Sequence, residues 1–408
     1  MSLRILEMHR VLKPTGSFYL HCDPTMSHYL KTICDVIFKS KYFKNEIAWC
    51  YETAGKSKKT FSKKHDVIFW YSKSDEYVFN PSDVSIPRKA NKHMRMGVDE
   101  NGREYEEKTD RKTGKIYRWY LDEGRLPFDY WVDIHALNRE EKERLHYPTQ
   151  KPKALLERII KASSNEGDTV LDGFSGCGTT VDAAEGLHRN WIGIDISPIA
   201  ISLVKRRLMD TYGEHLSKFE VRGTPTDEQS AIELWKQNPN AFQDWWLTEF
   251  EVFSTTFGTK GADKGIDGIA QYLVTPHSPP FVKGGKSAKG GGGSTYAGEE
   301  GVIRAAFQVK GGVHIQSKDI DALLGAMDKH KCELGVFLTI AEPTKPMLDT
   351  IASSGFIEIP GFKIPRLQIL TLEDYFKKKL LKLPKYNITF KAAQLKGKKK
   401  QNQMKMDI

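Results

Sequence analysis

Residues 170–180 constrain the fold of this chain more than any other stretch, because they join a strand, a turn and a helix. The run reads VLDGFSGCGTT: apolar residues lead to Asp172, and glycines then lead into small residues. A second apolar run, at 191–195, ends in Asp195. This order is typical of a parallel β-α-β unit, in which glycines let the backbone approach a ligand closely. The pattern predicts an α/β fold with the two aspartates at the ends of neighbouring strands.

A unit with these features holds a nucleoside. The carboxylate that ends the second strand, Asp195, can accept hydrogen bonds from both ribose hydroxyls. Taken alone, however, the glycine-rich turn is weak evidence, because a turn used only for packing has a similar sequence. The segment upstream of residue 170 therefore decides between the two interpretations.

That upstream segment, residues 146–152, reads HYPTQKP and is followed by leucines and isoleucines at helical spacing. The ordered series resembles the end of a β-class amino-methyltransferase of DNA, a family that methylates adenine N6 or cytosine N4. The resemblance implies a Rossmann-like sheet that binds S-adenosylmethionine. It also implies cofactor binding by Thr149, Lys151, Asp172, Phe174, Gly176, Gly178, Thr179 and Asp195. Gly173 stands where the family usually has proline, which should change only the stiffness of the loop.

The composition limits the remaining possibilities. A chain of 408 residues is expected to form two or three domains. No apolar run approaches the roughly 20 residues that cross a bilayer, so we expect a cytoplasmic protein without membrane association. The five cysteines are scattered and lack metal-ligand spacing, which argues against structural zinc and fits a reducing compartment. The net charge of +10 suits a polyanionic partner.

The N-terminal segments extend the resemblance. Residues 3–38 predict a helix, a strand and a helix, and residues 47–51 and 67–71 predict short buried strands. The segments LKPTGS, HCD and KKHDVIFWYSKS also resemble the methyltransferase family and place residues 1–222 in one catalytic sheet. Residues 80–145 are polar, charged and rich in aromatics, and the resemblance makes them a target-recognition region that contacts DNA. The alternative is a surface insertion whose aromatic side chains form a small local core.

Residues 223–241 are polar and predict a linker to a second αβ domain at 242–380. In this domain one strand begins near Asp267, and a later strand carries Gln308 and Lys310 on one face because they are two residues apart. An aspartate followed by Gln-x-Lys resembles the Mrr-like branch of the PD-(D/E)xK restriction endonucleases. The resemblance implies a catalytic set of Asp267, Gln308 and Lys310, with Mg²⁺ held by Asp267 and Gln308. Because an amide oxygen is a weaker ligand than a carboxylate, an inactive remnant that docks DNA is the alternative.

The catalytic tetrapeptide of the β class, (Asp/Asn/Ser)-Pro-Pro-(Tyr/Phe), has no counterpart upstream of these segments. Residues 278–281 read SPPF, but they lie far beyond the cofactor block, and we interpret the match as coincidental. Residues 23–26, DPTM, lack the second proline and the aromatic residue, and predict a turn at a strand end. The sequence is therefore expected to be the C-terminal, N-terminally truncated part of a methyltransferase, with a separate N-terminal fragment as partner. Residues 381–408 predict a disordered basic tail.

Three functions follow from these patterns. The first is methylation of an exocyclic amine in double-stranded DNA by S-adenosylmethionine, within a restriction-modification system and with adenine N6 favoured over cytosine N4. The amine attacks the methyl carbon directly, so Cys177 in the loop needs no catalytic role. The second is Mg²⁺-dependent DNA cleavage by the C-terminal domain, alone or together with methylation. The third is a catalytically inactive protein that only binds DNA.

Overall fold

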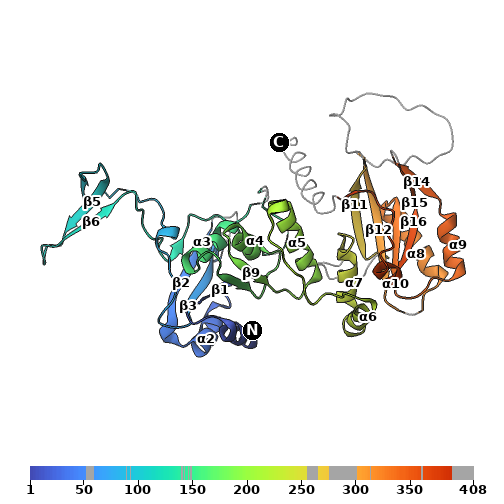
Figure 1. The fold of residues 1–408 in the computed structure, drawn as a ribbon, viewed down its shortest axis with the longest axis horizontal. Helices are drawn as coiled ribbons and strands as arrows, with labels where there is room; N and C mark the ends of the chain where they lie inside the picture. The colour runs from blue at the N-terminus through green and yellow to red at the C-terminus, as the bar shows by residue number, and fades with distance from the viewer. Residues whose placement is uncertain are drawn as a thin grey trace, which may run out of the picture. The chain divides into compact units, whose positions relative to one another are not determined.

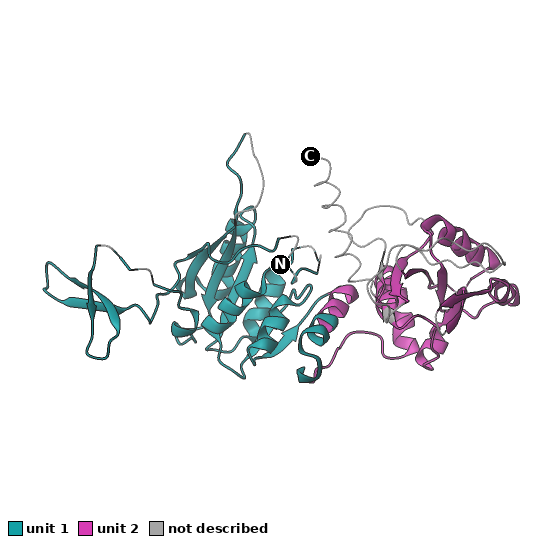
Figure 2. Ribbon diagram, turned by 90° about the horizontal axis from the view of Figure 1, so that it is seen from above, with its two compact units in different colours: residues 1–195, 206–217 teal, residues 196–205, 218–408 magenta. Residues whose placement is uncertain are grey.

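The computed structural model describes residues 1–51, 59–88, 90–91, 93–138, 141, 143–145, 147, 149–254, 265–274, 301–312, 314–359 and 362–387. The chain forms two compact units (Figure 2). The first contains residues 1–195 and 206–217, and the second contains 196–205 and 218–408. Residues 278–281 and most of the basic tail lie outside the described ranges. Within those ranges, no helix is long and apolar enough to cross a membrane.

The first unit contains a mixed sheet near its N-terminus, in the order β1-β3-β2-β7, in which β1, β3 and β2 are antiparallel and β7 is parallel to β2. The bounds of its strands and flanking helices are α1 (Ser2–Val11), β1 (Ser17–Cys22), α2 (Ser27–Phe38), η1 (Ser40–Tyr42), β2 (Phe43–Cys50), β3 (His65–Ser72) and β7 (Tyr130–Trp131). Both β1 and α2 match the sequence prediction closely. Phe18, Phe69 and Tyr71 pack with residues of α1 and α2, whereas Ile47 and Trp49 pack with Leu155 of the following helix. The sheet therefore has apolar packing on both faces.

A separate pair of parallel strands carries the glycine-rich run. Its elements are α3 (Lys153–Ser163), β8 (Thr169–Asp172), α4 (Thr179–Gly186), β9 (Asn190–Gly193), α5 (Pro198–Tyr212) and η3 (Gly213–His215). Val170 and Trp191 pack against α3 and α4. We expected one continuous sheet for residues 1–222, and this expectation is wrong for the described residues. β1 bonds only to β3 and β8 only to β9, so the hydrogen-bonding ladder does not continue between them.

Residues 80–145 contain a three-stranded antiparallel sheet, the arm, which stands away from the rest of the first unit (Figure 1). Its elements follow η2 (Ser82–Val84) and are β4 (Arg95–Val98), β5 (Glu104–Thr109) and β6 (Ile116–Tyr120). Its aromatic residues pair with cations: the guanidinium carbon of Arg118 lies 3.8 Å from the ring centre of Tyr105, and that of Arg103 lies 4.0 Å from the ring centre of Tyr120. The arm is therefore a folded sheet, held by strand pairing and by contacts between cations and aromatic rings.

The second unit begins earlier than expected. The segment 223–241 is not an extended linker, because it contains α6 (Glu228–Gln237) and the start of α7 (Pro239–Thr248). Asp227 accepts a hydrogen bond from the backbone of Ser230, and the Ser230 hydroxyl accepts one from the backbone of Asp227, so a capping box starts α6. The polar composition of this segment is typical of a linker, and for that reason α6 was not predicted from the sequence.

The main sheet of the second unit has the order β10-β11-β12-β13-β16, with β17 bonded to β11, and a hairpin of β14 and β15 accompanies it. The bounds are β10 (Phe253–Ser254), β11 (Gly268–Leu273), β12 (Val302–Lys310), α8 (Ser317–His330), β13 (Leu334–Thr339), α9 (Lys345–Ser353), β14 (Phe356–Ile359), β15 (Phe362–Pro365), β16 (Leu367–Thr371), α10 (Leu372–Phe376) and β17 (Tyr386–Asn387). β12, β13 and β16 are parallel. Apolar clusters cover both faces, one with Phe307 and the other with Phe337.

Candidate functional site

Asp172, which ends β8, and Asp195, which follows β9, lie at the same edge of the β8-β9 pair. Because the strands are parallel and Asp172 is paired with Gly193, both strands end at this edge. Asp195 was expected to close its strand, but it lies two residues beyond Gly193 in the loop that follows. This loop stays attached to β8, since the Ile194 backbone donates to the Asp172 carbonyl at 2.8 Å. The edge therefore brings both carboxylates together.

The loop between β8 and α4 needs glycine at two positions. Gly176 has φ +50° and Gly178 has φ +75°, and both values lie in the left-handed region that favours glycine. The backbone N–H of Gly176 donates to Asp195 Oδ2 at 2.8 Å. The Ser175 N–H donates to the Ile194 carbonyl at 2.9 Å. Asp195 thus fixes the loop through its bond to the Gly176 backbone.

The remaining loop residues differ in where their side chains lie. The backbone of Phe174 donates to Asp172 Oδ1 at 2.9 Å, and the Phe174 ring is 41% exposed beside the guanidinium of Arg4. Thr179, in contrast, is buried, and its hydroxyl accepts a hydrogen bond from Arg207 at 2.8 Å. Phe174 is therefore accessible to a ligand, whereas the Thr179 side chain is engaged in the interior. Its backbone N–H still belongs to the first turn of α4.

The upstream block lies against this loop. A Cβ atom on Gly176 would lie 3.1 Å from the ring of Tyr147, so the ring covers the glycine. Thr149 has φ +64°, which is strained for a β-branched residue. The ammonium of Lys151 donates to Asp66 at 3.1 Å. Lys151 was predicted to bind the cofactor, and its charge is already paired with a carboxylate of β3.

Asp66, the carboxylate that pairs with Lys151, was not identified from the sequence. Asp66 Oδ2 also contacts His21 Nε2 at 2.8 Å, and Tyr51 donates to Oδ1 at 3.1 Å. Burial alone would raise the pKa of Asp66, but His21 and Lys151 hold it well below its usual range. Burial is also the main cause of the lowered pKa of His21, despite the nearby Asp66. Both residues stand in the HCD and KKHD segments, which were the available signal.

The three residues that the sequence predicted as a nuclease site lie on or next to two neighbouring strands of the second unit, β11 and β12. Asp267 comes just before β11, where its Oδ2 accepts a hydrogen bond from the Val309 backbone at 2.7 Å. Asp267 precedes Gly268, which pairs with Phe307, so continuing this register places Asp267 beside Gln308. Gln308 is 7% exposed, and its Oε1 has no hydrogen-bond partner among the described residues. Lys310 contacts Asp319 of α8 at 3.7 Å, a residue that the sequence motif did not include. No group of three or more His, Cys, Asp or Glu residues that could hold a metal occurs among the described residues.

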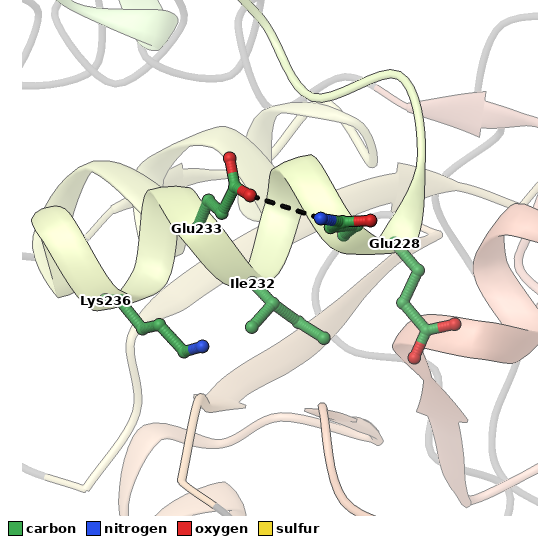
Figure 3. A pocket seen from close by; sticks show the side chains of 5 residues that line it. Glu228, Ile232, Glu233 and Lys236 are labelled. Carbon is green, nitrogen blue, oxygen red and sulfur yellow. Dashed lines mark hydrogen bonds between the residues drawn. The ribbon is translucent and has the colours of Figure 1, made fainter.

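A surface hollow lies elsewhere. It is lined along α6 by Glu228, Gln229, Ile232, Glu233 and Lys236, and Figure 3 shows these side chains. Gln229 donates to Glu233 at 3.4 Å. The hollow contains none of the predicted site residues, and its two acidic side chains and one lysine converge on no common point in the view. It is not the candidate site.

The glycine loop between two parallel strands and the aspartates at their ends define an α/β protein of the β-α-β type, and comparison with known proteins gives its family. A family profile described as DNA methylase (N6_N4) matches residues 1–206, which is half of the chain. The chain therefore belongs to the N6/N4 DNA methylase family. Residues 196–205 within this match fall in the second compact unit.

Two sequence relatives agree with this assignment. The type II methyltransferase M.HpaI of Haemophilus parainfluenzae is 33% identical over 206 residues, covering 50% of this chain and 56% of the relative. The DNA adenine methyltransferase YhdJ of Escherichia coli is 31% identical over 225 residues, covering 54% and 70%. The crystal structure of the M1.HpyAVI-SAM complex is 22% identical, covers 51% of this chain and 82% of that chain, and has a TM-score of 0.34. The chain thus spans about half the length of the first of these relatives.

Proposed function

We propose that this chain acts in the transfer of a methyl group from S-adenosylmethionine to an exocyclic amine of DNA, as part of a restriction-modification system. The observation that carries the proposal is the shared edge of β8 and β9, where Asp172, the glycine loop and Asp195 meet. Membership of the N6/N4 DNA methylase family supports the same reaction. S-adenosylmethionine supplies an electrophilic methyl group on sulfur when it is bound.

The residues at this edge fit the cofactor. Two left-handed glycines leave the backbone of the loop without side chains, so a ligand can approach it closely. Asp195 lies just past the end of the second strand of the pair, the position from which a carboxylate accepts hydrogen bonds from ribose hydroxyls in this type of β-α-β unit. The exposed ring of Phe174 offers an apolar surface to a purine. The protein's contribution is to bind and orient, since methyl transfer to an amine needs no protein nucleophile.

Calorimetric titration with S-adenosylmethionine tests this proposal. The change Asp195→Ala should weaken binding at least tenfold, because a hydrogen bond to a charged group contributes about 1.5–3 kcal/mol. Asp168→Ala is the matched control, because Asp168 precedes β8 at its opposite end and accepts from the Asn165 backbone at 2.9 Å. Equal affinity of the wild type and Asp195→Ala would contradict the assignment of the site.

Adenine N6 is the favoured target. YhdJ, a relative of this chain, is named a DNA adenine methyltransferase. Incubation of unmethylated DNA with the full chain and S-adenosylmethionine, followed by mass spectrometry of the nucleosides, distinguishes the targets. We expect N6-methyladenine, and recovery of N4-methylcytosine alone would reverse the preference.

The arm is the proposed DNA-contacting part. At the tip of its β5-β6 hairpin, Arg111, Lys112 and Lys115 are exposed and have no carboxylate within ion-pair distance in the described part of the chain. Asp110, the one acidic residue of the turn, accepts hydrogen bonds from the backbones of Lys112 and Thr113. The arginines of the sheet itself are neutralised, as in the pair of Arg103 with Asp122 at 2.8 Å. The tip therefore offers the uncompensated charge that attracts phosphates.

Cleavage of DNA by the second unit is a second candidate function. The observation that favours it is the buried Oε1 of Gln308, which has no hydrogen-bond partner in the part of the chain that the structure describes, on a residue that lies beside Asp267. A divalent cation such as Mg²⁺ accepts both carboxylate and amide oxygens as ligands. Asp267 and Gln308 would hold the ion, which supplies Lewis acidity to a phosphate, and Lys310 would lie beside them on β12. Mg²⁺-dependent nicking of plasmid DNA should disappear in Asp267→Ala and in Lys310→Ala. Nicking that persists in both variants would exclude this site.

A further inference from the structure

One carboxylate joins three parts of the first unit. Asp66 on β3 is 14% exposed at its side chain, and its two oxygens meet three polar side chains. His21 comes from β1, Tyr51 follows β2, and Lys151 comes from the block upstream of α3. The Lys151 ammonium also lies 5.6 Å from the ring centre of Trp49 on β2. Lys151 thus contacts the β1-β3-β2-β7 sheet through its ion pair with Asp66 and through the ring of Trp49.

The same block is attached to the glycine loop at its other side. Tyr147 packs on Gly176, and Lys153, in the first turn of α3, contacts Asp182 in the first turn of α4 at 2.8 Å. The opposite end of α3 contacts the start of β1, where Tyr19 and Ser163 are 2.7 Å apart. Asp66 and Lys151 therefore lie at the end of α3 that faces the glycine loop.

These contacts give Lys151 a role other than direct ligand binding. Its charge is compensated by Asp66, and its side chain is directed towards β2 and β3. We propose that Asp66 and Lys151 form a latch, a positioning pair that holds Tyr147 and Thr149 against the glycine loop. Lys151 then supports cofactor binding through Asp66, without touching the cofactor. This inference rests on the proposed function for its binding readout and on the fold alone for its exchange readout.

Direct contact and a latch differ in a double-mutant cycle. If Lys151 supported the cofactor independently of Asp66, the decreases in affinity caused by Lys151→Met and Asp66→Asn would add, as they do for residues that do not act together. If the two residues act as one latch, the double variant binds no more weakly than either single variant. Asn replaces Asp without a change of size, so the cycle removes the ion pair and leaves the packing of β3 in place.

The chain contains a matched control. Lys31 and Asp35 of α2 form a similar network with Tyr71 of β3: Lys31 lies 2.7 Å from Asp35, and Tyr71 lies 2.7 Å from the same carboxylate. Lys31 also lies over an aromatic ring, 4.0 Å from the ring centre of Phe43. Lys31→Met and Asp35→Asn remove the same chemistry from a place that does not contact the block upstream of α3.

The experiment measures two quantities on the full chain and its variants. Calorimetry with S-adenosylmethionine should show about tenfold weaker binding for Lys151→Met, for Asp66→Asn and for the double variant alike. Hydrogen exchange, measured without ligand, should be faster for peptides that contain Gln150 and Lys153 in all three variants. The Lys31 and Asp35 variants should change neither quantity.

Additive decreases in affinity would overturn the latch, and so would unchanged exchange at Gln150 and Lys153. A wild type that fails to bind S-adenosylmethionine, yet shows faster exchange in all three latch variants, would refute the proposed function and leave the latch intact. Faster exchange throughout the first unit, rather than around Lys153, would mean that Asp66 supports only general stability and would also reject the latch.

Discussion

Two sets of parallel strands in this protein, β12-β13-β16 and β8-β9, are covered to different extents. In the second unit, all six residues of β13 are buried, and apolar clusters pack on both faces of the sheet. In the first unit, β8 and β9 alternate between partly buried and exposed positions, and only the face with Val170 and Trp191 packs on helices. Leu171, Ile192 and Ile194 are 36%, 51% and 53% exposed. Parallel strands are usually covered on both faces, so β8 and β9 are the exception.

The difference separates two ways of holding a strand in place. β13 is held by burial, which contributes roughly 25 cal/mol for each Å² of apolar surface removed from water. β8 and β9 are held by one packed face and by the hydrogen bonds that join the glycine loop to Ile194 and Asp195. The weakly buried pair, β8 and β9, carries the proposed cofactor site. The well-buried sheet carries Gln308 and Lys310 on β12, and Asp267 lies just before β11. Four predictions test this comparison.

The largest effect is expected from equivalent truncations in the two sheets. Leu338→Ala should reduce the free energy of unfolding of the second unit by about 2–5 kcal/mol, because Leu338 is fully buried in β13. Ile192→Ala should reduce that of the first unit by less than about 1 kcal/mol, because half of its side chain is already in water. Denaturant titration followed by circular dichroism measures both. Equal reductions would show that the outer face of β8 and β9 is covered in solution.

Glycine substitutions should separate folding from binding. Gly335→Ala places a Cβ 2.4 Å from the sulfur of Met327, and the overpacked core should be destabilised by about 1–3 kcal/mol. Gly178→Ala instead forces alanine into a left-handed backbone, which costs about 1–2 kcal/mol and falls on the loop. We expect Gly178→Ala to weaken S-adenosylmethionine binding severalfold and Gly335→Ala to leave it unchanged. The reverse pattern would move the binding site out of the first unit.

The arm extends the comparison to a sheet that contributes no residue to the apolar clusters of the described chain. Replacing Arg111, Lys112 and Lys115 with glutamine should weaken binding of a DNA duplex and reduce its salt dependence, by about 0.9 in the log-log slope for each phosphate that is no longer neutralised. Fluorescence anisotropy at several salt concentrations measures this slope. Glutamine at Lys13, Lys39 and Lys41 removes the same charge elsewhere in the first unit. Equal weakening in the two triple variants would mean that only net charge matters.

The smallest effect is expected from pH. Because the folded-state pKa of Asp66 lies below its unfolded value, its stabilising contribution is complete above the unfolded pKa of about 4 and is lost as the pH falls. The wild type should therefore lose stability more steeply than Asp66→Asn between about pH 5 and pH 2. Parallel curves in urea titrations across this range would contradict the lowered pKa.

Local patterns in the sequence predicted the elements well and their assembly less well. Alternation and turn residues located β1, α2 and β13 because each element is decided by neighbours in the sequence. The separation of β8 and β9 from the N-terminal sheet was missed, because strand pairing depends on distant residues. Helix α6 was missed because its polar composition resembles a linker, although Asp227 and Ser230 formed a recognisable capping box.

The candidate sites divide in the same way. The motif placed Asp172, Gly176 and Asp195 in the order in which they meet at the strand edge. It did not reveal that Thr179 turns towards Arg207 or that Lys151 turns towards Asp66, because those partners lie far away in the sequence. A family motif identifies which residues gather at a site, but the direction of each side chain depends on the tertiary structure.

The left-handed backbone of Thr149 has a consequence for how this region can be dissected. At φ +64°, a threonine opposes its own conformational preference, and glycine would adopt the same angle without that cost. Thr149→Gly therefore relaxes the folded chain while it also makes the unfolded chain more disordered, so the two effects on stability partly cancel. A change in binding affinity caused by Thr149→Gly is then assigned mainly to the lost hydroxyl and methyl groups. This position therefore allows side-chain recognition to be separated from backbone shape.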